Sequence, residues 1–270
     1  MADAVDAVHV LLGDLSQPLA RSLGLSKLPE HAHVLVVSAL SFWIIHIIIA
    51  PTLSKVLFPG SYGRLKTPRD RNNWNIRIVS LLHAFIVIPL SFRNLNLPAL
   101  DADRAFGWDP KEGTLVSIAC GYFLWDILES VIHFTDIGFV IHVSKKPFIA
   151  FYGPRFLLWE LSTPFLNIHW FLDKLGLTGS TIQFVNGFFL LSTFASTRLV
   201  FGSFQSYNFF KTLFAIKDEA PFAVLLVFGM GNVVLSGLNV IWFTKMIAAL
   251  QKRRKPAQKI GNVANGKKAD

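Results

Sequence analysis

Long apolar runs separated by short polar connections dominate the pattern of this chain. Each run is near the ~20 residues that a ~30 Å hydrocarbon layer requires. We predict six membrane-spanning segments, at 34–50, 75–92, 114–134, 155–173, 181–201 and 221–249. A seventh stretch, 137–152, is apolar at both ends but is interrupted by Lys145, Lys146 and Pro147, so we expect a short or truncated span there. The pattern predicts an all-α fold, a polytopic transmembrane helix bundle.

Composition supports one integral membrane domain. Of 270 residues, 52% are hydrophobic and only 16% are charged, and the mean hydropathy is +0.47. Soluble domains of this size are far less apolar. We expect an N-terminal segment at 1–33, which forms a short surface helix or stays loose, a transmembrane domain at 34–250 and a basic tail at 251–270.

The distribution of charge predicts an orientation. Basic residues outnumber acidic ones in the 51–74 connection, which therefore belongs on the cytosolic side, whereas the acidic 93–113 connection suits the lumen. The basic tail then places the C-terminus in the cytosol, and the N-terminus is lumenal. Such ends require an odd number of crossings, which again points to a defective span near 137–152.

Several classes of function find no support. The net charge of +9 is not arranged as an aromatic and basic reading surface, so we predict no nucleic-acid partner. A single cysteine, Cys120, excludes a disulfide framework and a cysteine zinc site. The chain has no G-x-S-x-G elbow, phosphate loop or H-E-x-x-H helix, and its histidines are too scattered to predict a metal site.

Ionisable residues within the 114–134 run are the first candidate site. Asp126, Glu129 and His133 follow one another at i, i+3 and i+7, so they share one stripe of a helix. Ionisable groups in hydrocarbon persist mainly where they face a bundle interior or a water-filled cavity. The stripe is either a proton-handling set or headgroup site, or a structural bridge between helices. We expect Glu129 to contribute least.

A second polar stripe lies in the 155–173 run. Glu160, Thr163 and Asn167 repeat the same spacing, so two polar stripes can face each other. Pro164 removes a backbone donor and is expected to kink this helix.

Two further residues are candidates in other spans. Arg198 either provides a counter-charge for Asp126 or Glu160, or extends toward the membrane interface. His83 lies near the middle of the second span and is either part of a lipid-binding chamber or a core histidine with a hydrogen-bond partner.

The runs YFLWDILESVIHFTDIGFVIH and RFLLWELSTPFLNIHWF resemble the TLC-domain family over about residues 34–250. The nearest likeness is to small TLC-domain proteins that carry the E-L-S-[ST]-P-F-L-N run, here Glu160 to Asn167. This resemblance implies a bundle of the endoplasmic reticulum membrane with a lumenal N-terminus and a lipid-accessible chamber.

The same resemblance implies candidate catalytic residues. Ceramide synthases of the family use paired histidines and nearby aspartates for acyl transfer from acyl-coenzyme A to a sphingoid base. Asp126 and Asp136 match the aspartates and His142 matches the first histidine, but Val143 stands at the second position. The short apolar run after His142 also indicates a deletion or a splice variant.

Lys267 and Lys268, near the C-terminus, resemble a dilysine retrieval signal, which indicates the endoplasmic reticulum. Our leading hypothesis is a membrane protein of lipid homeostasis that binds or adjusts lipids without a cofactor. Asp126, Glu160, Asn167, Arg198 and His83 would contact the lipid. The alternatives are an acyltransferase that uses His142, Asp126 and Asp136, with acyl-coenzyme A as co-substrate, and a non-enzymatic cargo receptor or translocation accessory.

Overall fold

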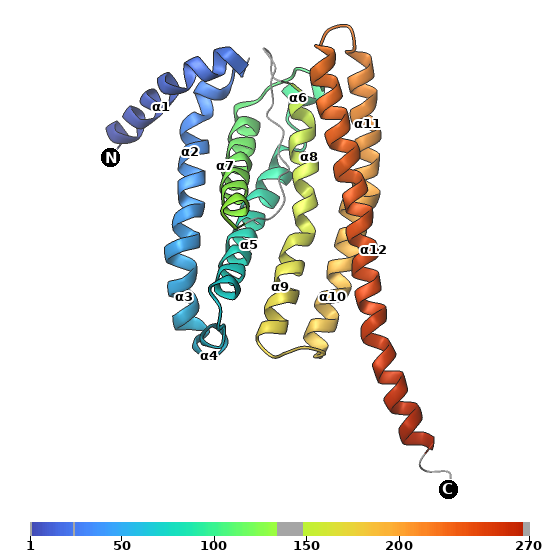
Figure 1. Ribbon diagram of the computed structural model, residues 1–270. Helices are drawn as coiled ribbons and strands as arrows, with labels where there is room; N and C mark the ends of the chain where they lie inside the picture. The colour runs from blue at the N-terminus through green and yellow to red at the C-terminus, as the bar shows by residue number, and fades with distance from the viewer. Residues whose placement is uncertain (1, 24, 134–147, 267–270) are drawn as a thin grey trace.

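The computed structural model describes residues 2–23, 25–133 and 148–266, and this part of the chain is helical with no strand. The helices pack side by side as a bundle (Figure 1). Within these described ranges, four helical segments are long and apolar enough to cross a membrane, which makes the chain a multi-pass membrane protein. They are Leu28–Leu57, Pro68–Asn94, Thr181–Ala215 and Phe222–Ala249.

The N-terminal segment is a helix, α1 (Ala2–Leu23), which packs against the start of the first span. That span joins α2 (Leu28–Ile44), the π-helical turn η1 (Ile45–Ile49) and α3 (Ala50–Leu57) without a break in direction. Of the two outcomes expected for 1–33, the structure has the helix.

A short helix, α4 (Pro59–Gly63), leads to the second span, α5 (Pro68–Asn94). Thr67 caps α5, because its hydroxyl accepts a hydrogen bond from the Asp70 backbone N–H at 3.0 Å. The helix thus begins seven residues before the predicted 75–92 segment, and this difference brings Asn72 into the bundle.

The chain continues through α6 (Pro98–Ala102) to α7 (Pro110–His133), which lies against α2. Gly121 permits this close approach. A Cβ added at Gly121 would lie 2.6 Å from the Ser38 Cβ and 2.8 Å from the Leu35 carbonyl oxygen. Small residues bring membrane helices together in this way.

The predicted 155–173 span is divided rather than continuous. It consists of α8 (Gly153–Leu157), the 3₁₀ turn η3 (Leu158–Ser162) and α9 (Thr163–Lys174), preceded by the short 3₁₀ turn η2 (Ala150–Tyr152). Pro164 stands in the first turn of α9, where a missing backbone N–H breaks no intrahelical bond. The irregular backbone therefore precedes the proline.

The last two candidate spans lie in the C-terminal part of the chain. The third candidate span joins α10 (Thr181–Phe194), the π-helical turn η4 (Ala195–Phe201) and α11 (Gly202–Ala215). The fourth lies in α12 (Phe222–Gly266), which passes through residue 250 and leaves the bundle as a single helix (Figure 1).

Four of the six predicted spans coincide with the membrane candidates, and α7 and the divided α8–α9 segment correspond to the other two. α1 lies at the end of the bundle where α2 begins, and α12 leaves at the opposite end (Figure 1). α7 and α8 both begin near the C-terminal end of α5, where Asn94 donates to Glu112 and a Cβ at Gly153 would meet the same carboxyl. Most of the predicted truncated span, 137–147, lies outside the described residues.

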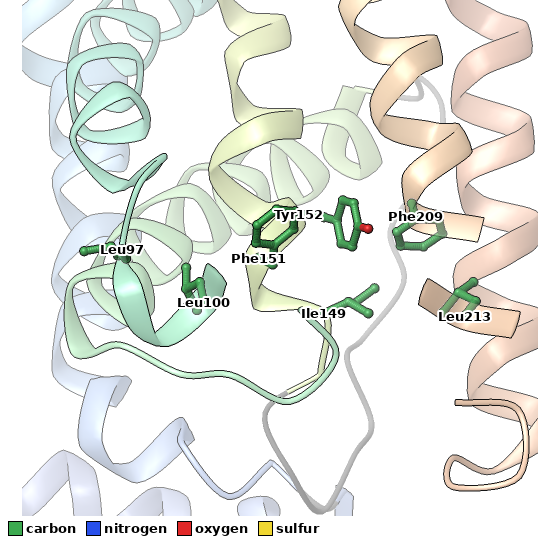
Figure 2. Packing of buried hydrophobic residues seen from close by; sticks show 7 residues of the cluster. All are labelled: Leu97, Leu100, Ile149, Phe151, Tyr152, Phe209 and Leu213. Atoms are coloured by element: carbon green, nitrogen blue, oxygen red, sulfur yellow. The ribbon is translucent and has the colours of Figure 1, made fainter. Parts of the chain in front are cut away.

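An apolar cluster joins α6, η2 and α11 at this end of the bundle (Figure 2). Tyr152 packs edge-on against Phe209, with ring centroids 5.3 Å apart, and its hydroxyl lies 2.7 Å from the Thr212 hydroxyl. The cluster consists of Leu97, Leu100, Ile149, Phe151, Tyr152, Phe209 and Leu213. It fixes the start of α8 against α11, and so positions the polar groups that follow.

Candidate functional site

The first polar group of the interior is centred on His46. The π-helical turn η1 carries this imidazole, which is 4% exposed, toward α5 and α7. Its Nε2 lies 2.8 Å from the Asn72 Oδ1, and the Asn72 amide donates in turn to the Glu129 Oε1. The Glu129 Oε2 lies 3.6 Å from the His46 Nδ1. The asparagine therefore links a histidine on one helix to a carboxylate on another.

Asp126 lies one turn before Glu129 on the same face of α7. Its carboxyl group is within electrostatic reach of Glu129 and Glu160. The Tyr122 hydroxyl bonds with Ser80 and is also within electrostatic reach of Asp126. In the part of the chain that the structure describes, Asp126 forms neither a hydrogen bond nor an ion pair. The two polar stripes expected from the sequence thus come together, with an acid that lacks a donor between them.

The second polar group is centred on Arg198, in the π-helical turn η4. Its Nε donates to the Trp159 carbonyl at 2.9 Å and to the Ser162 hydroxyl at 3.1 Å. One terminal nitrogen donates to the Asn239 Oδ1 at 3.3 Å, and the other lies 3.9 Å from the Glu160 Oε1. The side chain is 13% exposed, so it points into the bundle instead of toward the interface. Of the two partners considered, Glu160 is the one it contacts.

Asn167 connects α9 to α5. Its Oδ1 accepts a hydrogen bond from Arg77 at 3.3 Å, and its amide donates to the Ser80 hydroxyl at 3.1 Å. The Arg77 guanidinium stacks over the Trp170 ring at 4.6 Å. The Ser80 hydroxyl also bonds with Tyr122 of α7. This hydroxyl therefore joins Asn167 of α9 to α7.

His83 differs from its predicted environment. The residue is fully buried, as a core histidine should be, but neither ring nitrogen has a hydrogen-bond partner among the described residues. Its ring stacks on Tyr122 instead, with centroids 3.8 Å apart and an angle of 8° between the planes. Of the two alternatives for His83, the core position fits its burial, and an aromatic face lies where a polar partner was considered.

A buried carboxyl group also lies outside the predicted spans. Glu112 is fully buried near the start of α7, and its Oε2 accepts from the Asn94 amide at 3.0 Å. Its Oε1 has no hydrogen-bond partner in the described part of the chain. Burial raises the pKa of Glu112 to about 8, although the Asn94 hydrogen bond and the nearby Arg155 lower it. This carboxyl is therefore largely protonated at neutral pH.

Some predicted residues cannot be placed. Asp136, His142, Lys267 and Lys268 lie outside the described residues, and α7 ends at His133. Conversely, the sequence analysis missed His46, Asn72 and Asn239. Single histidines and asparagines in apolar runs carry little signal, although Phe42, His46, Ala50 and Ser54 are buried at a spacing of four, which is longer than the α-helical repeat.

Comparison with known proteins identifies a domain. Residues 73–248 match the TLC domain model, and no solved structure gives a significant match to the chain. The match begins in the first turns of α5 and ends within α12, so it includes both Asp126 and Arg198.

Relatives of similar length occur in yeasts and vertebrates. A TLC domain-containing protein of Schizosaccharomyces pombe is 38% identical over 90% of this chain and 87% of its own length. Topoisomerase I damage affected protein 4 of Saccharomyces cerevisiae is 29% identical over 84% of this chain and 87% of its own. TLC domain-containing protein 4 of Homo sapiens is 26% identical over 79% and 86%. The chain therefore belongs to the TLC-domain family.

Proposed function

We propose that this chain is a multi-pass protein of the endoplasmic reticulum membrane, with a cytosolic C-terminus, that binds or adjusts membrane lipids and so contributes to lipid homeostasis. The charge bias of the connections and the lysine pair near the C-terminus support the location. The polar groups inside an apolar bundle support the lipid-binding role.

One observation carries the proposal: Asp126 is an acid in a membrane interior, close to two other acids, and no donor among the described residues bonds to it. A polar group in such a place is costly unless it finds a partner. A lipid head that carries hydroxyl or amine donors supplies that partner. Tyr122 and Ser80 stand beside the carboxylate and complete a set of polar groups for such a head.

Apolar surfaces on the same helices accommodate the rest of an amphiphile. Leu124 and Leu128, on the side of α7 opposite Asp126, are each 42% exposed. The acyl chain would lie on such outward-facing residues of the bundle while its head enters between the helices. In this proposal Glu160, Asn167 and Arg198 hold the far side of the chamber, and no cofactor takes part.

The test is to extract the full chain with its surrounding lipids into polymer nanodiscs and identify the lipids by mass spectrometry. We expect one class with hydroxyl or amine donors to be enriched over the bulk membrane. Asp126→Asn should reduce that enrichment several-fold, since the amide keeps the shape but loses the charge. Asp218→Asn, at an exposed position between α11 and α12, is the matched control.

Two outcomes would overturn the proposal. A wild-type lipid profile identical to that of the bulk membrane would mean that the interior polar groups serve only as a structural bridge between helices. Acyl transfer by wild-type microsomes, supplied with sphingoid base and acyl-coenzyme A, that disappears in His142→Ala would replace binding with catalysis.

A further inference from the structure

A pocket of about 200 Å³ opens beside α4, apart from the polar interior. Its lining residues come from α3, α4 and the first turn of α5, and α4 lies at the end of the bundle opposite α6 (Figure 1). Its lining residues are Lys55, Pro59, Tyr62, Gly63 and Arg71. Neither the candidate site nor the proposed lipid chamber uses any of these residues.

The pocket is positively charged. Lys55 and Arg71 line it from two different helices, and no acidic residue does. The acid nearest in sequence, Asp70, receives a hydrogen bond from the Thr67 hydroxyl at 2.6 Å. Within the described residues, neither Lys55 nor Arg71 forms an ion pair. Two uncompensated cations converging on one concavity favour an anionic ligand.

The walls of the pocket are held in place before any ligand binds. The Arg71 Nε donates to the Leu65 carbonyl at 3.1 Å, which leaves the terminal nitrogens of the guanidinium for a ligand. Tyr62, only 4% exposed, forms the buried wall, and its hydroxyl donates to the Asn75 Oδ1 at 3.3 Å. A fixed guanidinium beside an ammonium group suits the oxygens of a phosphate.

The position of the pocket points to a membrane source for that phosphate. Lys55 lies near the end of the first candidate span, beside Leu53, Val56 and Leu57, which are 51%, 71% and 63% exposed. Exposed apolar side chains there face lipid tails, so Lys55 lies near the level of the headgroups. Basic residues that only orient a span would flank it, whereas these two share one concavity.

We propose that this pocket binds a phosphate group, carried by the headgroup of an anionic phospholipid, with Lys55 and Arg71 as the two cationic contacts. The acyl chains of that lipid lie along the exposed residues of α3. The site is independent of the interior chamber, so loss of one binding activity leaves the other intact.

The positive charge of the pocket and its free volume can be removed by separate substitutions. Lys55→Gln with Arg71→Gln removes both cations, and Arg64→Gln with Lys66→Gln is the matched control, because those residues do not line the pocket. A Cβ at Gly63 meets nothing within 4 Å, so Gly63→Leu extends into the pocket without changing charge. A Cβ at Gly60 also meets nothing, and Gly60 lies outside the lining, so Gly60→Leu is the steric control.

The experiment uses the full chain in phosphatidylcholine nanodiscs, with phosphatidate as the lipid probe and glycerol 3-phosphate as the soluble probe. Native mass spectrometry counts bound phosphatidate, and titration calorimetry measures glycerol 3-phosphate. We expect phosphatidate binding to weaken roughly thirtyfold in the double glutamine variant, since two basic residues at about 1 kcal/mol each contribute about 2 kcal/mol. Gly63→Leu should give a similar loss, and both controls should stay within about twofold of the wild type.

The soluble probe distinguishes the two sources of phosphate. Weak binding of glycerol 3-phosphate beside tight binding of phosphatidate supports the lipid source, whereas equal affinities assign the pocket to a free phosphate ester. Wild-type binding of phosphatidate no tighter than that of phosphatidylcholine would overturn the proposal. Equal losses in the pocket variants and their controls would also overturn it, because they would reduce the effect to general surface charge.

Discussion

His46 and Arg198 lie in the same kind of backbone turn, in different spans, and each lies near a carboxylate, but Arg198 has more hydrogen-bond partners than His46. The turn η1 places His46 against Asn72, and the Asn72 amide donates a hydrogen bond to Glu129. The turn η4 brings Arg198 against Glu160 and three further acceptors from η3 and α12. Single π-helical turns are rare and often occur at functional sites.

The difference shows what each residue requires in an apolar bundle. An imidazole can be neutral, so a single amide suffices as an intermediary. A guanidinium keeps its charge and carries five donors, so it needs a carboxylate together with carbonyl, hydroxyl and amide oxygens. The same kind of π-helical turn therefore holds His46 with one amide hydrogen-bond partner in the first span. In the other span it holds Arg198 with four acceptor groups.

The largest expected effect tests the turn η4, which carries Arg198. Arg198→Leu should reduce the free energy of unfolding by about 3–5 kcal/mol, because Glu160, whose side chain is 19% exposed, would remain as a largely desolvated charge without its cation. Thermal unfolding of the full chain in detergent micelles measures the loss. Lys211→Leu, at an exposed position of α11, is the control. A loss no larger than that of the control would mean that the guanidinium is not a structural centre.

The second prediction tests the close packing of α7 against α2, the helix that leads into η1. Gly121→Ala should destabilise the chain by about 1–3 kcal/mol, because the new methyl group would meet the Ser38 Cβ and backbone atoms of α2. Unfolding in detergent again measures the change. Gly231→Ala is the matched control, since a Cβ there meets nothing within 4 Å. Equal stability of the two variants would show that α2 and α7 can separate without loss.

Glu112 lies outside both turns, and burial raises its pKa to about 8. Its titration therefore tests the effect of burial on a carboxyl group away from the two turns. The native state then binds more protons than the unfolded state between its ordinary pKa and pH 8, so this group lowers stability as pH rises through that window. The loss between pH 6 and pH 8 should be about 2 kcal/mol, and Glu112→Gln should remove it.

Unfolding temperatures of the wild type and Glu112→Gln across that range measure this contribution. Asp109→Asn, at a partly exposed position of the same connection, controls for the general change in charge. Parallel pH curves for the wild type and Glu112→Gln would contradict a protonated carboxyl.

The smallest effect tests the turn η1, which carries His46. Asn72→Ala should cost about 1 kcal/mol, because hydrogen bonds between membrane helices contribute modestly. Asn73→Ala, an exposed neighbour on α5, is the control for helix propensity. A loss for Asn72→Ala equal to that for Arg198→Leu would erase the contrast between the two turns.

The sequence predicted one of these turns better than the other. Arg198 and Glu160 were candidates because a charged residue in an apolar run is itself unusual, and the structure places them 3.9 Å apart. Asn72 gave no such sign, since it precedes the predicted 75–92 span and follows a series of basic residues. Glu129, expected to contribute least, accepts from that asparagine.

The backbone irregularities were beyond prediction for a physical reason. A π-helical or 3₁₀ turn is set by contacts between helices, whereas periodicity reports only a regular repeat. The Pro164 break was expected, but its position before the proline depends on how Trp159 and Ser162 meet Arg198. Tertiary contacts thus decide the details that the apolar pattern leaves open.

The turn η4 also sets the angular phase between the two helices it joins. The buried residues Leu190, Phe194, Gly202 and Phe209 stay on one side of this segment only because the turn takes up an extra residue. Deletion of one residue from Ala195–Phe201 would rotate α11 by about 100° relative to α10. Gln205 and Ser206 would then swing toward the lipid, and the bundle would lose the seam that α11 shares with α8 and α12.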